Sequence, residues 1–164
     1  MLSNFFLTAK KSDESVAEAK RQACYDGALG ARGIHALQSY GRDKPVYDNN
    51  AYTITSTYHD GTLKLYTIHP LKPTRPGSRP EYVMTQLKAF ALTSDPETFR
   101  QGATAFRNGR DLAKEWRDGF IEAANKRVRG ISIESQSSIS TAVSALVESD
   151  TSANKTEYEN THQK

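Results

Sequence analysis

Residues 51–68 read AYTITSTYHDGTLKLYTI, and this stretch decides the fold class. Two runs of β-branched and aromatic residues, 51–58 and 62–68, alternate with a period of two, which is typical of strands. Asp60 and Gly61 stand between them, and an Asp-Gly pair tolerates the positive φ angles of a tight turn. The stretch therefore predicts a β-hairpin that turns at residues 59–61.

Ahead of the hairpin, the sequence predicts a strand followed by a helix. The segment NFFLTA at 4–9 is a short apolar run, and its two adjacent phenylalanines favour a buried strand. Ser15 and Glu18 have the spacing of a capping box, which predicts that a helix begins there and runs to about Tyr40. Small residues recur along this helix at steps of three and four, which predicts a smooth face close against a sheet: Ala19, Ala23, Gly27, Gly30 and Ala31.

Behind the hairpin, residues 70–80 contain four of the six prolines and are expected to form an exposed loop. Residues 81–92 predict a strand that leads into a turn. Ser94 and Glu97 form a second capping box, which predicts a helix from there to about Val128. The order strand, helix, hairpin, strand, helix predicts an α/β (α+β) domain with a small mixed sheet.

Charge and composition divide the chain near Gly130. Residues 1–130 carry 20 of the 22 basic and 14 of the 19 acidic residues, a net charge of +6, which leaves −3 for residues 131–164. This second segment is rich in Ser and Thr, so it buries too little apolar surface to offset the entropy cost of ordering its backbone. The sequence predicts a folded domain at 1–130, whose charge suits a polyanionic partner, and a disordered acidic tail at 131–164.

Several function classes lack their markers. Cys24 is the only cysteine, which excludes an intrachain disulfide and a thiolate metal cluster. No apolar run reaches the roughly 20 residues of a membrane span, and the first residues lack the basic region of a signal peptide, so we expect an intracellular protein, cytoplasmic or nuclear, without a membrane partner. No Gly-rich phosphate loop, Gly-x-Ser-x-Gly elbow or His-Glu-x-x-His motif occurs. The histidines are predicted to be surface or turn residues: His35, His59, His69 and His162.

The segment NFFLTAK at 4–10, followed by AKRQACYDG at 19–27, resembles the second half of a PD-(D/E)XK nuclease-type core, in a version common in uncharacterised fungal proteins. Further segments resemble the same fungal family: YHDGTLKLY at 58–66, EYVMTQL at 81–87, and FRQGATAFRN at 99–108 with its continuation to residue 118. The resemblance covers about residues 2–127. It implies a partial restriction-endonuclease-like core and a metal-dependent nuclease ancestry.

In those relatives the apolar strand ends in Glu-x-Lys, and the next helix carries a Gln-x-x-Tyr-like segment that faces the site. Lys10 and Gln22 match this pattern, but Thr8 stands where the acid is expected. In intact relatives carboxylates hold Mg²⁺, the metal activates a water, and the lysine stabilises developing charge. Because the chain begins at Met1, the strand that bears the second acid is expected to be missing as well. The resemblance therefore implies a truncated, degenerate copy without a cofactor.

Four interpretations stay open. The first is an inactive nuclease-like domain that retains weak nucleic-acid binding, and the second is a protein-interaction module that uses the Pro-rich loop and the acidic tail. The third is an active nuclease that uses Asp13, Glu14 or Glu18, and the fourth is a gene fragment without a selected function. For nucleic-acid binding, the candidate residues form one face of the last helix, which is otherwise a solvated face: Arg107, Arg110, Lys114 and Arg117.

Overall fold

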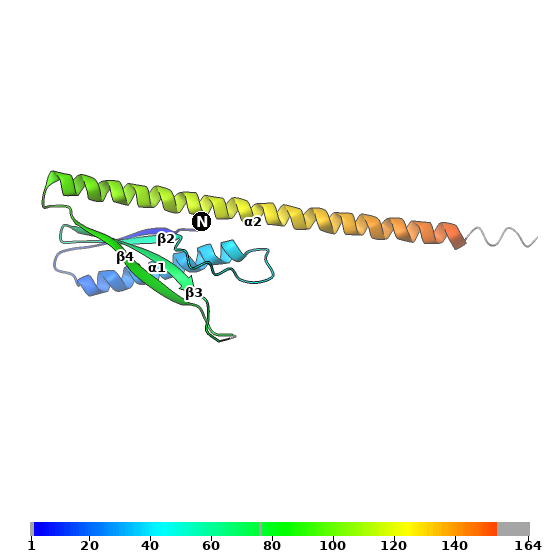
Figure 1. The fold of residues 1–164 in the computed structure, drawn as a ribbon, viewed down its shortest axis with the longest axis horizontal. Coiled ribbons are helices and arrows are strands. Elements are labelled where there is room, and N and C mark those ends of the chain that lie inside the picture. The colour runs from blue at the N-terminus through cyan, green and yellow to red at the C-terminus, as the bar shows by residue number, and fades with distance from the viewer. Residues whose placement is uncertain (1, 76, 154–164) are drawn as a thin grey trace, which may run out of the picture. The chain divides into compact units, whose positions relative to one another are not determined.

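The computed structural model describes the backbone of residues 2–75 and 77–153 and the side chains of residues 2–75 and 77–130. The predicted α/β class and element order are confirmed (Figure 1). The strands form one mixed sheet in the order β1-β2-β3-β4. The elements along the chain are β1 (Phe5–Lys10), α1 (Val16–Ser39), β2 (Thr53–His59), β3 (Thr62–Leu71), β4 (Glu81–Ala91) and α2 (Pro96–Ala153).

The sheet combines a parallel crossover with an antiparallel meander. Strand β1 pairs in parallel with β2 through the α1 crossover, while β2, β3 and β4 follow one another antiparallel. The first strand was predicted to be buried, but it lies at the edge of the sheet. Leu7 is half exposed and Phe6 is only partly buried, because within the described residues β1 pairs with a single strand, β2.

The hairpin turn has the geometry that its sequence predicts. Asp60 has a φ of 44° and Gly61 a φ of 72°, so both central residues lie in the left-handed region. Turns of this kind match the right-handed twist of the two strands that they connect. The turn is also hydrogen-bonded to the residue that follows β4, because the backbone N–H of Leu92 donates to the carbonyl oxygen of Gly61 at 2.7 Å.

The two helices cover opposite faces of the sheet, α1 on one side and the part of α2 up to Ala124 on the other (Figure 1). Alternation along β2 separates the faces, because Thr55 lies against Gly27 of α1 and Ile54 lies near Gly109 of α2. The buried face of α1 is the predicted one, extended towards its end: Ala19, Ala23, Gly27, Gly30, Ala31, Ile34 and Gln38.

The α2 side holds the larger apolar side chains. Leu63, Leu65 and Phe90 form its buried cluster, and Phe106 packs against them from the helix. Phe106 also meets Phe5 of β1 edge to face, with ring centroids 5.0 Å apart. Strands and helix are therefore joined by aromatic and aliphatic contacts that bury apolar area, which is the main stabilising term for a domain of this size.

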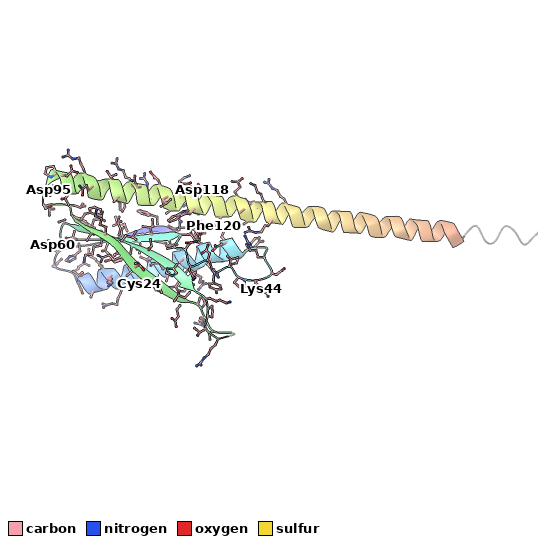
Figure 2. All side chains as sticks on the ribbon, viewed as in Figure 1. Cys24, Lys44, Asp60, Asp95, Asp118 and Phe120 are labelled. Carbon is pink, nitrogen blue, oxygen red and sulfur yellow. The ribbon has the colours of Figure 1, made fainter. Side chains whose placement is uncertain are left out.

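Helix α2 begins at a different residue from the one its sequence predicts. The carboxylate of Asp95 accepts hydrogen bonds from the Thr98 backbone N–H at 2.8 Å and from the Thr98 hydroxyl at 2.7 Å. Ser94, the expected N-cap, instead donates to the carbonyl oxygen of Ala91 at 2.8 Å. Asp95 is the cap because Pro96 then occupies the first helical position, where its missing N–H costs nothing. Figure 2 labels Asp95 at this end of the helix.

We expect the cap to make stability depend on pH in the acid range. Hydrogen bonds from the Thr98 backbone N–H, the Thr98 hydroxyl and Ser94 lower the pKa of Asp95 from 3.8 to about 2. A lowered folded pKa contributes stability that is complete above the ordinary pKa and is lost as pH falls through the folded one. The midpoint of thermal unfolding should be higher for the wild type than for Asp95→Asn at pH 7, and the difference between the two midpoints should shrink between about pH 4 and pH 2. A difference that stays constant over that range would contradict the assignment.

Helix α2 continues past Gly130 to Ala153, although periodicity predicted its end near Val128 and composition predicted disorder from Ile131. Between Gly130 and Ala153 the sequence has no further glycine or proline, so no local signal stops the helix. The rest of the predicted tail, residues 154–164, lies outside the described residues. By its contacts the chain divides into two units after Ala124, ahead of the predicted boundary. None of the helices in the described residues is long and apolar enough to span a bilayer.

Candidate functional site

The carboxyl ends of β1 and β2 lie beside the beginning of α1, and Thr8 and Lys10, two of the positions named by the resemblance, lie there. In the sheet register, Thr8 is opposite Thr57, and Lys10 is opposite His59. The next strand continues both rows, because Lys64 is opposite Thr57 and Thr62 is opposite His59. Residues opposite one another in a sheet share a face. Two cross-strand rows of polar side chains therefore lie on the α1 face: Thr8, Thr57 and Lys64, and Lys10, His59 and Thr62.

Thr8 is buried within the α1 side of the fold. The residue is 8% exposed, and its hydroxyl has no hydrogen-bond partner among the residues that the structure describes. A neutral hydroxyl supplies neither the negative charge nor the bidentate oxygens of a carboxylate. The position that the resemblance assigns to a metal-binding acid thus holds a residue that does not fit Mg²⁺.

Lys10 is held by Glu14 at the loop that leads into α1. Its Nζ donates to Glu14 Oε1 at 3.1 Å, and the backbone N–H of Lys11 donates to Glu14 Oε2 at 2.8 Å. The hydrogen bond with Glu14 raises the pKa of Lys10. The backbone N–H of Lys11 and then Lys10 lower the pKa of Glu14. Both oxygens of Glu14 are occupied, so this carboxylate closes the loop and is a poor replacement for the lost acid.

Gln22 does not join these residues. It lies on the exposed side of α1, and its Nε2 donates to Asp26 Oδ1 at 2.8 Å, one helical turn further on. The buried side of the helix is occupied instead by Ala19, Ala23 and Gly27. Of the two remnants predicted by the resemblance, the structure therefore places only Lys10 beside Thr8.

The sequence predicted His59 only as a surface or turn residue and did not single out Lys64, and both line a pocket of about 250 Å³ at this edge of the sheet. The ring Nε2 of His59 is 2.9 Å from the carbonyl oxygen of Glu14, so the tautomer protonated at Nε2 donates there. The hairpin sequence could have located Lys64, because a turn at residues 60–61 places Lys64 opposite Thr57. The other residues that line the pocket are Val16, Ala19, Thr57, Asp60 and Thr62.

In the described residues, no three side chains of His, Cys, Asp or Glu are grouped to hold a metal ion. The acids at and just before the start of α1, Asp13, Glu14 and Glu18, form no such group either. His162 lies outside the described residues. Thr8 and Lys10, with Glu14 held in the loop, do not offer the oxygen ligands that Mg²⁺ requires.

The predicted basic face of α2 is exposed at Arg107, Arg110 and Lys114 and half-buried at Arg117, and it is largely paired with acids of the same helix. Arg110 lies 2.9 Å from Asp111, and Lys114 and Arg117 lie 2.6 Å and 3.2 Å from Asp118. The hydrogen bond from Lys114 lowers the pKa of Asp118, which Figure 2 labels on the helix. Of the four predicted residues only Arg107 has no ion pair with a described carboxylate. This pairing reduces the positive potential that the face would present to a phosphate.

A second polar cluster, at the far end of α1, anchors the loop before β2. Asp48 Oδ2 accepts from Gln38 Nε2 at 2.7 Å and from the Tyr52 hydroxyl at 2.8 Å, and its Oδ1 accepts from the Asn50 backbone N–H at 3.0 Å. Burial raises the pKa of Asp48, but these hydrogen bonds outweigh it and leave the pKa lowered. Because both carboxylate oxygens are satisfied within the protein, the cluster has the chemistry of a structural anchor.

No protein-family model, curated protein or solved structure matches the chain, so its function is inferred from the residues themselves.

Proposed function

We propose that this protein is a catalytically inactive, nuclease-like domain that binds nucleic acid through contacts with phosphates. The observation that carries the proposal is a positive charge of +6 over residues 1–130, with a threonine in place of the acid beside Lys10. Binding to a phosphate backbone needs only exposed cations, whereas phosphodiester hydrolysis needs a metal held by carboxylates. This chain has exposed cations, but its described donor groups do not support a metal held by carboxylates.

The geometry around Thr8 and Lys10 supports the inactive part of the proposal. In an active site of this type, the lysine would act on a water or on developing negative charge next to the metal. Here Lys10 is engaged with Glu14, and Thr8 offers only a buried hydroxyl. The resemblance to a partial restriction-endonuclease-like core supports nuclease ancestry, and the site residues support its loss of activity.

The test combines binding and cleavage on the full chain. Binding to a fluorescent DNA duplex, followed by anisotropy, should weaken linearly on a log–log plot as salt rises, because phosphate contacts release counterions. No cleavage above a buffer control should occur with Mg²⁺ or Mn²⁺, and Thr8→Glu should not restore it. Metal-dependent cleavage that Lys10→Ala abolishes would overturn the inactive assignment, and the absence of salt-sensitive binding would overturn the binding assignment.

The alternative, a protein-interaction module, is favoured by one observation on α1. Tyr25 and Leu29, one helical turn apart on α1, are 64% and 49% exposed and share a face of the helix. Exposed apolar groups that share a helix face are typical of interaction surfaces. Failure to bind DNA at low salt would favour this function over the first.

A further inference from the structure

Strands β3 and β4 continue beyond the rest of the sheet as a two-stranded arm. The pairing of β2 with β3 begins at Thr53 and Ile68, so the later residues of β3 have no partner on that side. The pairing of β3 with β4 continues from His69 opposite Val83 to Leu71 opposite Glu81. Figure 1 shows the two strands running past the end of β2 to the loop that joins them. The arm carries the Pro-rich loop at its tip.

The tip holds three cations without acidic partners. Lys72, Arg75 and Arg79 are exposed, and none of them forms an ion pair with a carboxylate in the part of the chain that the structure describes. They line a hollow of about 280 Å³ together with the hydroxyl residues Thr74 and Ser78. Glu81 is the one acidic residue of that hollow. Three unpaired cations and two hydroxyl groups supply the donors that bind phosphate oxygens.

The backbone of the tip is restrained before any ligand arrives. Pro73 and Pro80 fix φ on either side of the turn, and the Ser78 backbone N–H donates to the carbonyl oxygen of Arg75 at 3.2 Å. Gly77 has a φ of 80°, a conformation that glycine adopts without strain. A restrained loop loses less conformational entropy on binding than a flexible tail does, so its cations bind a phosphate at a lower entropy cost.

The tip differs from the basic face of α2 in the availability of its charges. Arg110, Lys114 and Arg117 already have carboxylate partners on their own helix. A phosphate would compete with those carboxylates on α2, whereas on the arm it would meet free cations. Electrostatics therefore favours the arm over the helix face that the sequence suggested.

We propose that the β3–β4 arm binds the phosphate backbone of duplex DNA, with Lys72, Arg75 and Arg79 as the contact residues; this inference rests on the proposed function. A two-stranded ribbon fits the major groove of B-form DNA, which is about 12 Å wide. The major groove of A-form RNA is too narrow and deep for such an element. Duplex DNA is therefore the polyanion that matches both the shape and the charge of the arm.

The experiment compares two charge-matched triple variants in the full chain. One is Lys72→Gln, Arg75→Gln, Arg79→Gln, and the control on α2 removes the same charge: Arg107→Gln, Arg110→Gln and Lys114→Gln. Thermal unfolding midpoints close to that of the wild type show that both variants fold. The arm variant should bind a DNA duplex at least about tenfold more weakly at 0.1 M salt, and its salt slope should fall by about 2 to 3 because up to three phosphate contacts are lost. The control should lose less than about threefold, since two of its cations contribute little beyond their ion pairs.

Two further binding measurements distinguish duplex DNA from other sources of phosphate. An RNA duplex of the same sequence should bind more weakly than DNA, and inorganic phosphate should compete only at millimolar concentrations. Equal losses in the two variants, or tighter binding of the RNA duplex, would overturn the arm proposal while the proposed function stands. A wild-type chain that binds no duplex at low salt would overturn both.

Discussion

Replacing Gly27 by Leu is expected to lower the free energy of unfolding by about 3 kcal/mol, the upper end of the range for overpacking a core. A Cβ atom at Gly27 would lie 2.0 Å from Ile68 Cδ1 and 3.3 Å from Thr55 Cγ2. Ile68 is 1% exposed and Thr55 is fully buried, so neither side chain can move aside into solvent. A larger residue must therefore push α1 away from the sheet. Urea unfolding followed by circular dichroism measures the loss.

The same substitution at Gly119 is the matched control. Gly119 is also inside a helix, but a Cβ added there meets no atom within 4 Å. Gly119→Leu should therefore keep or raise stability, by up to about 1 kcal/mol, because leucine favours the helix more than glycine does. Equal effects at the two positions would mean that helix propensity, and not contact with the sheet, governs Gly27.

Replacing Asn4 by Asp is expected to cost about 3 kcal/mol or more at pH 7, although the two side chains have nearly the same shape. Asn4 is 1% exposed, and its Nδ2 donates to the carbonyl oxygens of Tyr52 and Ala113 at 2.8 Å and 2.6 Å. It thereby ties the start of β1 to the loop before β2 and to α2. A carboxylate at this position would have no proton to donate and would face two carbonyl oxygens in a buried site.

This loss should depend on pH in a defined direction. Burial and the two carbonyl oxygens would raise the pKa of the new Asp above its unfolded value of about 3.9. A raised folded pKa means that the loss relative to the wild type is smallest below about pH 4 and grows as pH rises through the folded pKa of the new Asp. Asn108→Asp, at an exposed position on α2, is the control and should show a small effect at every pH. An Asn4→Asp loss that is the same at pH 3 and pH 8 would show that the buried charge is not its cause.

Much of the secondary structure could be predicted because its signals are local. The Asp60-Gly61 turn depends on the φ angles of two adjacent residues, and the polarity of 51–58 and 62–68 alternates with the pleat. Ser15 begins α1 as predicted, since its side chain accepts from the backbone N–H of Glu18 three residues later. The start of α2 was displaced by one residue because Ser94 and Asp95 both have cap chemistry, and Pro96 decides between them.

The site could be predicted only in part because its residues meet through the sheet register. Thr8 and Lys10 are two residues apart in sequence, so their shared face followed from the strand itself. Their neighbours Thr57 and His59 come from a strand that follows the 24 residues of α1 and a loop, and no local pattern specifies that pairing. Gln22 stands at the position where the resemblance expects a glutamine. However, the small residues of α1 face the sheet, and Gln22 therefore lies on the solvent side of the helix.

The sequence by itself determined the class of the domain, its hairpin and the helix starts to within a residue, because each depends on neighbours a few positions away. Only the tertiary structure decided that β1 is an edge strand and that Lys10 pairs with Glu14. It also decided that Arg110, Lys114 and Arg117 pair with acids of their own helix, while Lys72, Arg75 and Arg79 form no ion pair with a carboxylate among the described residues. These properties depend on which surfaces pack together, and burial of apolar area between distant segments selects that arrangement.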